Sequence, residues 1–544
     1  MKSDKYSRDL PTGIERKAQH LLLMMDYDSL DVSSTPALDT FTPSARPRLR
    51  LSKSRYLSGL QCQKRLYLEI HSPELATPAD PDRQALFDMG TEVGALARRR
   101  FPGGILVEET HRQTRAAVQR TAELIQDPGV PAIFEGAFIY RDTLVRVDVL
   151  QRLTEDTWRL IEVKATSKVK RIHLHDLTIQ AFVLMGQGIS IVESCLMHLN
   201  THYTYQGGEL DLEQLFTLAD LTDTVRDRQS QVNGKLELMR QALEEPMPPD
   251  IEPSGHCHTP YECPFWSYCT KDKPSRWIFH LPGRNQNFTE LTARGIQTID
   301  EIPTDIRLTV LQQRIKDNVE WISSDLLSIL QSVTYPVHHL DFETYMPAIP
   351  VYPNTRPYGP SPIQWSNHIE YEDGTVRHET YLCQDDRDPR EEVAQGVLDS
   401  LGKEGSICVY SDYERHLLGL LGNVFPSLKP EFSRVMNRLW DLLFIIQNYY
   451  YHPGFQGSFS IKSVLPALAP HLAYDDLEIR HGALASVIFR KMIFEESDLV
   501  ERLRLSQDLH DYCARDTQGM LELRRILLEK ASGMEQSPNS SSSH

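Results

Sequence analysis

The strongest constraint on the fold of this chain is the stretch VHHLDFETYMPAIPVY, which begins at Val337. Its first residues form an apolar run that predicts a buried strand. Asp341 and Glu343 lie at the end of this run, and because they are two residues apart on a strand, both side chains point to one face. Burying carboxylates costs free energy unless a partner compensates them. A bound divalent cation is the compensation that this pattern favours.

The length and composition indicate a globular protein with more than one domain. With 544 residues the chain is too long for one ordinary core, and 40% of the residues are hydrophobic while 24% are charged. No apolar run reaches the length of a membrane span. The segment HLLLMM, from His20, is too short for the core of a signal peptide. We therefore expect a cytoplasmic protein with no membrane partner.

The formal net charge of -17 argues against a protein that coats nucleic acid by bulk electrostatics. Two basic segments remain, RPRLRLSKSRY from Arg46 and KATSKVKR from Lys164. They are either solvated surfaces or the lining of a narrow basic groove beside metal-binding carboxylates. An acidic nuclease is compatible with this charge distribution.

Shifts in composition predict two blocks, a joint and two terminal segments. The terminal segments are rich in Ser, Thr, Pro and Asp, which is typical of disorder. In the joint, FTELTARGIQTIDEIP predicts a helix, a Gly turn and a short helix, and a longer helix is expected over 308–330. The expected boundaries are 1–45 (disordered), 46–275 (first block), 276–334 (helical linker), 335–530 (second block) and 531–544 (disordered).

The first block contains a predicted strand hairpin over 144–166. Apolar and polar residues alternate on both sides of the turn QRLTEDT. Asp148 lies on the first strand, while Glu162 and Lys164 share one face of the second. Two carboxylates can hold a divalent cation, and an adjacent ammonium can stabilise negative charge on a phosphate. A Glu-x-Lys pair on a strand is also common as a surface ion pair, so both interpretations stand.

The order of these residues, followed by an apolar helix with Gln180, resembles the PD-(D/E)XK nuclease fold of the RecB type. The resemblance implies that Asp148, Glu162 and Lys164 form a metal site, which Gln180 helps to complete. An upstream predicted helix, FDMGTEVGALARRRF, lies where that family often has a His, and only Glu92 is available there.

The eight cysteines fall into two groups. Four lie singly in apolar or helical surroundings, where we expect core packing: Cys195, Cys383, Cys408 and Cys513. The other four resemble the layout of iron-sulfur nucleases of the RecB and CRISPR-associated kind, with one Cys before the nuclease core and three after it: Cys62, Cys257, Cys263 and Cys269. Four thiolates suit a [4Fe-4S] cluster or zinc, and unrelated loop cysteines are the alternative.

The second block contains further acids. Tyr512 and Asp516 are four residues apart on a predicted helix and so share a face. Glu414 begins a predicted helix after an apolar strand, and Asp441 lies in RLWDLLFIIQ. With the opening acid pair, this order resembles the DEDD exonucleases of the ribonuclease H-like fold, in the variant with Tyr. The resemblance implies four carboxylates that hold two divalent metals, with the Tyr near the attacking water. That family usually has Asn and Asp at the second motif, where Ser411 and Glu414 stand here, so the third ligand is Glu414 or Asp441.

Three motifs of the second block, DFETYMPAIP, YYYHPGFQGSFSIKSVLPAL and YCARD, resemble the bacterial family of domain of unknown function 2779 (DUF2779). Its members often have the cysteine-bearing RecB-like block in front, and the resemblance extends from Leu51 to Lys530. It implies an α/β protein in which a RecB-like restriction-endonuclease fold is joined by a short helical linker to a ribonuclease H-like fold. The tyrosines of YYYHP either pack in the core or stack on bases.

The resemblance implies a metal-dependent nuclease that hydrolyses phosphodiester bonds with Mg2+ or Mn2+. A 3'-5' exonuclease acting on single-stranded DNA or RNA is the first expectation, with the RecB-like block as a second active site or a clamp. The alternative is a catalytically decayed nucleic-acid-binding or scaffolding protein. No Gly-rich phosphate loop of the Walker type is present, so a duplex substrate would require a separate helicase.

Overall fold

The computed structural model describes residues 50–78, 81–283 and 286–535, and these form two compact units. The N-terminal unit comprises the described residues up to Asp272 together with Pro347–Gly359. The C-terminal unit comprises Lys273–Met346 and the described residues from Pro360 onward. The segment 276–334, predicted as a linker, is therefore grouped with the C-terminal unit. No helix within the described part of the chain is long and apolar enough to cross a membrane.

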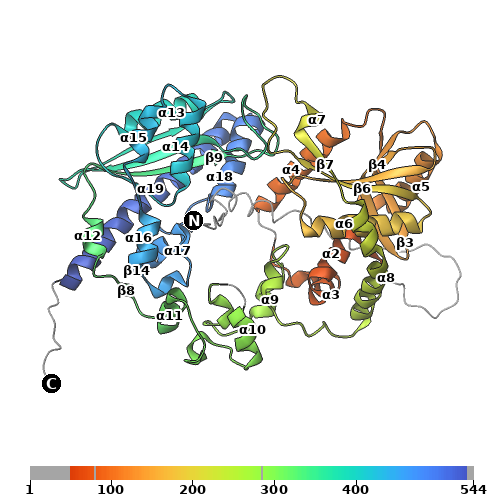
Figure 1. The fold of residues 1–544 in the computed structure, drawn as a ribbon, viewed down its shortest axis with the longest axis horizontal. Helices are drawn as coiled ribbons and strands as arrows, with labels where there is room; N and C mark the ends of the chain where they lie inside the picture. The colour runs from red at the N-terminus through yellow and green to blue at the C-terminus, as the bar shows by residue number, and fades with distance from the viewer. Residues whose placement is uncertain (1–49, 79–80, 284–285, 536–544) are drawn as a thin grey trace, which may run out of the picture. The chain divides into compact units, whose positions relative to one another are not determined.

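The N-terminal unit is built on a seven-stranded mixed sheet with the order β2-β3-β4-β5-β6-β7, and β1 pairs with β4 (Figure 1). The predicted hairpin is confirmed as the antiparallel pair β4 and β5, while β6 runs parallel to β5. The strands are β1 (Leu51–Ser52), β2 (Ile105–Leu106), β3 (Ala132–Tyr140), β4 (Thr143–Arg152), β5 (Thr157–Lys164), β6 (Ser190–Leu199) and β7 (Phe216–Asp220). The helices are α2 (Lys53–Gln61), α3 (Gln63–His71), α4 (Pro81–Arg98), α5 (Thr114–Gln126), α6 (Arg171–Gly186), α7 (Leu212–Leu215), α8 (Thr222–Glu244) and α9 (Trp266–Thr270).

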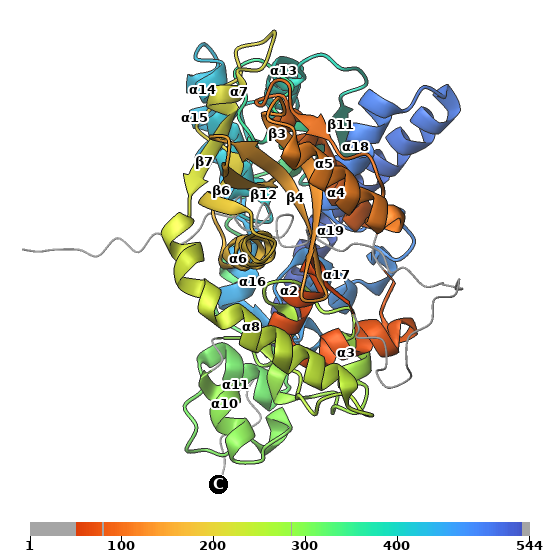
Figure 2. The same ribbon diagram turned by 90° about the vertical axis from the view of Figure 1, so that its right-hand side faces the viewer.

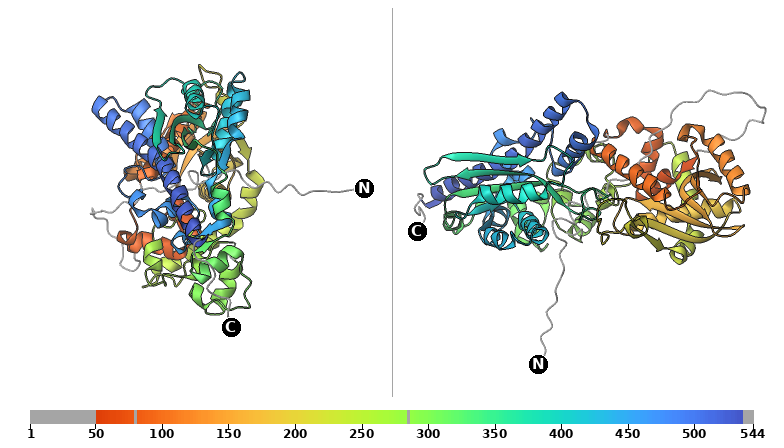
Figure 3. Two further views of the ribbon diagram at one scale, coloured as in Figure 1. Left: turned by 90° about the vertical axis from the view of Figure 1, so that its left-hand side faces the viewer. Right: turned by 90° about the horizontal axis from the view of Figure 1, so that it is seen from above.

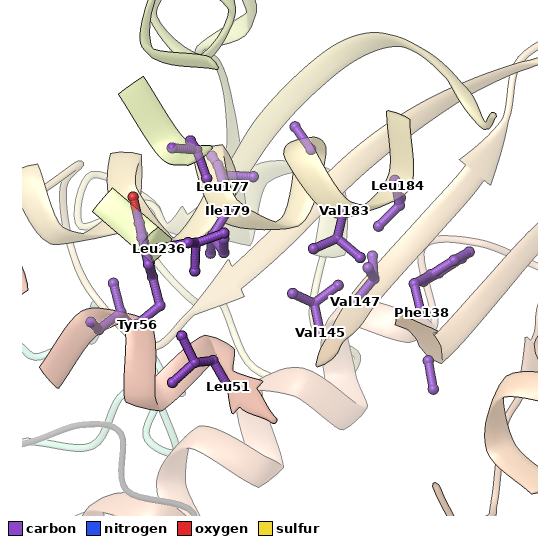
Figure 4. Close-up of a cluster of buried hydrophobic side chains, with 14 of the residues drawn as sticks. Leu51, Tyr56, Phe138, Val145, Val147, Leu177, Ile179, Val183, Leu184 and Leu236 are labelled. Carbon is purple, nitrogen blue, oxygen red and sulfur yellow. The ribbon is translucent and has the colours of Figure 1, made fainter. Parts of the chain in front are cut away.

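Helix α6 lies in the core of this unit, and residues on nearly all of its sides are buried, including the polar Asp176 and Gln180. Val183 of α6 packs beside Val145 and Val147 of β4 (Figure 4). The long helix α8 passes beside α6 and α3 (Figure 2). Each fully buried aliphatic side chain contributes about 1.5–3 kcal/mol, so this packing fixes α6 firmly against the sheet.

The segment Pro347–Gly359 completes the N-terminal unit. Thr355 forms an isolated antiparallel bridge with Tyr205, and Ala348 is buried in an apolar cluster that includes Leu215 and Phe216. The chain therefore leaves the C-terminal unit after β9, contributes this segment to the other unit, and returns for β10.

The C-terminal unit contains a five-stranded mixed sheet with the order β11-β10-β9-β12-β13. Strands β9, β10 and β11 are antiparallel neighbours, and β12 and β13 run parallel to β9. The strands are β9 (Val337–Tyr345), β10 (Ser361–Glu370), β11 (Val376–Leu382), β12 (Ile407–Val409) and β13 (Leu439–Asp441), and a separate pair consists of β8 (Trp321–Ile322) and β14 (Tyr450–Tyr451). The helices are α10 (Gln286–Ala293), α11 (Val310–Asp317), α12 (Leu326–Leu330), α13 (Arg390–Leu401), α14 (Tyr413–Val424), α15 (Lys429–Met436), α16 (Leu442–Tyr449), α17 (Ile461–Leu468), α18 (Gly482–Arg490) and α19 (Leu499–Glu535).

The two faces of β9 have different neighbours, as the alternation of side chains along a strand requires. Leu340 and Phe342 belong to an apolar core formed with helices α13, α14 and α15. The long helix α19 packs against β9 and β10 (Figures 1 and 3), and its Cys513 contacts Asp341. The acids at 341 and 343 therefore lie on the α19 side of the sheet.

Two predictions are wrong, one about a helix and one about where the C-terminal disordered segment begins. The helix expected over 308–330 is divided into α11 and α12, because Asn318 adopts a left-handed conformation with φ 54° and the chain then forms β8. Helix α19 extends to Glu535 and thus enters the segment 531–544 that was expected to be disordered. The remainder of that segment, and the predicted disordered segment 1–45, lie outside the described residues.

Two of the three tyrosines of YYYHP pack in the core, as one of the two interpretations of that motif predicted, while Tyr449 at the end of α16 is half-buried. Tyr450 and Tyr451 form β14 and are 0% and 1% exposed. The four isolated cysteines are also buried, as predicted: Cys195, Cys383, Cys408 and Cys513.

Candidate metal centre

Three of the predicted acids meet in the C-terminal unit. Asp341 and Glu343 come from β9 and Asp516 from α19, and one carboxylate oxygen of each lies within 4.8 Å of the other two. Glu343 and Asp516 are buried. Grouping carboxylates in a buried place is costly without a cation, and oxygen ligands of this kind suit Mg2+ or Mn2+. The residues therefore fit a divalent metal.

Tyr512 lies one turn before Asp516 on α19 and is buried. Burial raises the pKa of its phenol well above the ordinary value, and the negative charges of Asp516, Glu343 and Asp341 raise it further. The side chain is therefore an uncharged hydroxyl at neutral pH, which can donate a hydrogen bond beside the acids.

Two residues of this centre were missed in the sequence. The Lys462 ammonium, at the start of α17, donates a hydrogen bond of 2.6 Å to Oδ1 of Asp516. The Tyr474 hydroxyl donates to the same oxygen. Lys462 also lies over the rings of Tyr474 and Tyr512, at 3.5 and 4.4 Å from the ring centres. Lys462 belongs to the quoted motif GSFSIKSVLP, so a lysine inside a family motif was the available indication.

The two candidates for the third ligand lie outside the group of three acids. Glu414 is buried at the start of α14 and accepts a hydrogen bond of 3.3 Å from the Ser411 hydroxyl. Asp441 caps the N-terminus of α16 by accepting the Phe444 N–H at 3.0 Å, and burial raises its pKa. Within the described part of the chain, neither acid belongs to a set of three whose ligand atoms approach within 4.8 Å.

In the N-terminal unit, ion pairs surround Glu162 of β5. Its carboxylate is 0% exposed and lies 2.8 Å from the Lys164 ammonium and 3.0 Å from that of Lys53. Gln180 of α6 donates to it at 2.7 Å. Burial alone would raise the pKa of Glu162, but the two lysines and Gln180 lower it below its ordinary value. Lys53, from the first turn of α2, was not among the residues predicted for this site.

Asp176 is a second missed member of this cluster. It is buried on α6 and lies 3.1 Å from the Lys164 ammonium and 3.7 Å from that of Lys53. Its position one turn before Gln180 on the same helix was the available indication. The two lysines therefore serve two carboxylates, so the charge of Glu162 is compensated by the chain itself.

Asp148 approaches this cluster from β4. It accepts the Val163 N–H at 2.6 Å, and its pKa is raised well above the ordinary value by burial and by the charge of Glu162. Glu135 of β3 lies opposite Asp148 in the ladder and has φ 55°, a left-handed conformation that is unusual for a non-glycine residue. The pairs on either side are Phe134 with Val149 and Gly136 with Val147. After burial, the charges of Glu162 and Glu135 both raise the pKa of Asp148, so acidic groups are concentrated at this end of the cluster.

The four predicted ligand cysteines lie near α2 and α3, but among the described residues no three of their Sγ atoms lie within 4.8 Å of one another. Cys62 lies between these helices, and the Gln61 amide donates to the carbonyls of His256 and Tyr261 at 2.9 and 2.6 Å, which ties the cysteine loop to α2. Burial raises the pKa of Cys263 to about 12, and the neighbouring Cys257 and Cys62 add to the shift. Cys269 lies on α9, and burial raises its pKa, with a smaller contribution from the charge of Cys62. A metal or cluster that requires thiolates would reverse these shifts.

Comparison with known proteins gives one match. The family model described as Domain of unknown function (DUF2779) matches residues 338–460, a stretch that includes Asp341, Glu343 and Glu414. This match supports the DUF2779 resemblance for that stretch. No curated protein and no solved structure matches the chain.

Proposed function

We propose that this chain is a metal-dependent nuclease, a 3'-5' exonuclease on single-stranded nucleic acid. Its active site would be the group of three acids in the C-terminal unit. The observation that supports this most is the meeting of Asp341, Glu343 and Asp516, which come from segments far apart in the sequence. Three acids brought together in a largely buried place need positive charge beyond the single ammonium of Lys462, and a divalent cation is what a phosphodiesterase would bind there.

In this proposal the chain's own residues bind and orient the substrate. Mg2+ or Mn2+ held by the three acids would supply Lewis-acid polarisation of the phosphate. The neutral hydroxyl of Tyr512 would orient the attacking water. Hydrolysis joins the water oxygen to the phosphorus of the 3'-terminal nucleotide. The bond from that phosphorus to the 3' oxygen of the preceding nucleotide breaks, and this oxygen takes up a proton. Burial of the acids beside α19 limits access of other solvent.

We further propose a ribonuclease H-like fold of the DEDD type for the C-terminal unit and a RecB-like fold for the N-terminal unit. The support for the first is the order of the elements: an Asp-x-Glu pair on the central strand β9, an acid after β12, and a Tyr-x3-Asp helix that packs on β9. The support for the second is the hairpin of Asp148 and Glu162-x-Lys164 beside the Gln180 helix.

For the N-terminal unit we propose a clamp that holds the strand rather than a second active site. The support is that Glu162 itself contacts two ammonium groups and an amide, whereas the three acids of the C-terminal unit have the one ammonium of Lys462. The four cysteines would hold a [4Fe-4S] cluster, or zinc, in a structural role. Eight free cysteines fit a reducing, cytoplasmic location.

The test is degradation of 5'-labelled single-stranded DNA and RNA by the full chain with Mg2+ or Mn2+. The proposal predicts a ladder that shortens one nucleotide at a time from the 3' end and disappears when the metal is chelated. Tight binding of both strands without cleavage would instead support the decayed, scaffolding alternative, which the separation of Glu414 and Asp441 from the acid group favours.

A further inference from the structure

The acid group has a cation of its own. Lys462 is the second residue of α17. The N-cap residue Ser460 accepts the Lys462 backbone N–H with its hydroxyl at 3.4 Å. The Lys462 ammonium reaches Oδ1 of Asp516 at 2.6 Å and contacts the faces of Tyr474 and Tyr512. A charge-assisted hydrogen bond and two cation–π contacts hold the ammonium in one place.

The charges of the group balance with one divalent ion. The group has three carboxyl groups, and the Lys462 ammonium pairs with one of them, that of Asp516. A single Mg2+ or Mn2+ would balance the other two. Two metals about 3.5–4 Å apart would require a further carboxylate to bridge or hold the second ion. Glu414, which the resemblance to DEDD exonucleases suggested as that further carboxylate, lies outside the group of three acids and accepts a hydrogen bond from Ser411.

We propose that the Lys462 ammonium takes the place of a second metal ion, so that this centre works with one divalent cation. The inference rests on the proposed nuclease function and specifies how its site is charged. The Lys462 side chain is 28% exposed while that of Asp516 is 9% exposed, so the lysine is the more accessible member of this pair to a ligand from solution. Its ammonium would donate to a non-bridging phosphate oxygen and stabilise the charge that develops during hydrolysis.

The experiment is Mn2+ binding to the full chain by calorimetry, with Lys462→Met and Lys462→Arg compared with the wild type. Other parts of the chain can also bind Mn2+, so the ions of this centre are counted as those lost in Asp341→Ala. The inference predicts that one Mn2+ is lost. It also predicts that Lys462→Met binds Mn2+ at least about tenfold more tightly, because a competing positive charge is gone.

Turnover provides the second measurement. Lys462→Met should lower it about 100- to 1000-fold, the usual effect of removing one donor to a developing negative charge, and Lys462→Arg should restore part of it. A matched control is Lys491→Met, which also removes an ammonium that pairs with a carboxylate, that of Glu501 at 3.1 Å. The control should change neither quantity. Circular dichroism confirms that each variant is folded.

The outcomes separate this inference from the proposed function. Loss of two Mn2+ in Asp341→Ala, loss of none, or unchanged affinity and turnover in Lys462→Met would overturn the inference, even if the wild type degrades nucleic acid. The wild type could cleave nothing while Asp341→Ala loses one Mn2+ and Lys462→Met binds Mn2+ more tightly. In that case Lys462 still takes the place of a second metal ion, and the proposed nuclease function fails.

Discussion

Lowering the pH should decrease the free energy of unfolding of the C-terminal unit, because two adjacent histidines of β9 are buried in the uncharged form. His338 and His339 are 3% and 0% exposed. Burial lowers the pKa of His338 to about 4, and the nearby Arg438 lowers it too. Burial likewise lowers the pKa of His339 to about 3, with a smaller contribution from Arg524 of α19. In the folded chain both rings therefore stay neutral well below neutral pH.

The sign and size of the effect follow from linkage. In the unfolded chain each ring titrates near its ordinary pKa of about 6.5, so between that value and about 4 the unfolded state binds protons that the folded state does not. The free energy of unfolding is thus complete above about pH 7 and falls as the pH drops. At about pH 5 each ring costs about 2 kcal/mol, and the pair about 4 kcal/mol. This is a large part of the roughly 5–15 kcal/mol that stabilises a typical domain.

Hydrogen exchange of peptides from β9 and β10 measures this loss in the full chain. The opening free energy, corrected for intrinsic exchange rates, should be about 4 kcal/mol lower at about pH 5 than at about pH 7.5. His339→Gln has an amide that can still donate to the carbonyl of His368, as the imidazole does at 3.1 Å, but it does not titrate. It should remove about half of the pH dependence. Equal opening free energies at both pH values, or an unchanged slope in His339→Gln, would refute the reasoning.

Three further predictions concern stability and metal content. Gly405→Ala should lower the free energy of unfolding by about 2 kcal/mol or more, measured by urea unfolding, because φ is 87° there and a Cβ would overlap the carbonyl oxygen of Pro336. Lys53→Met should cost about 2 kcal/mol by the same measurement, since buried Glu162 loses a charge-assisted hydrogen bond; an unchanged midpoint would contradict this. Cys62→Ser should reduce the iron or zinc bound per chain in elemental analysis, whereas equal content would remove Cys62 from the ligand set.

The sequence predicted the features of this fold that depend on spacing along one element. Alternation with a period of two identified the β4–β5 hairpin, and a four-residue spacing placed Tyr512 and Asp516 on one face of α19. The period of two along a strand also assigned Asp341 and Glu343 to one face of β9. These patterns are local, so neighbouring residues are enough to read them.

The remaining features depend on contacts between distant segments, which no local pattern encodes. Lys462 meets Asp516, and Lys53 meets Glu162, only because the helices α17 and α2 pack where they do. The helix expected over 308–330 shows a similar limit, because the pairing of β8 with β14 overrides local helix propensity. The place of Pro347–Gly359 in the N-terminal unit likewise depends on packing against residues such as Leu215.

The most direct test of the central claim compares the wild type with Asp341→Ala and Glu162→Ala in degradation of end-labelled single strands with Mn2+. We expect stepwise 3' shortening to disappear in Asp341→Ala and to persist in Glu162→Ala, because the proposed catalytic acids are those of β9 and α19. Shortening that persists in Asp341→Ala and disappears in Glu162→Ala would instead place the active site in the N-terminal unit.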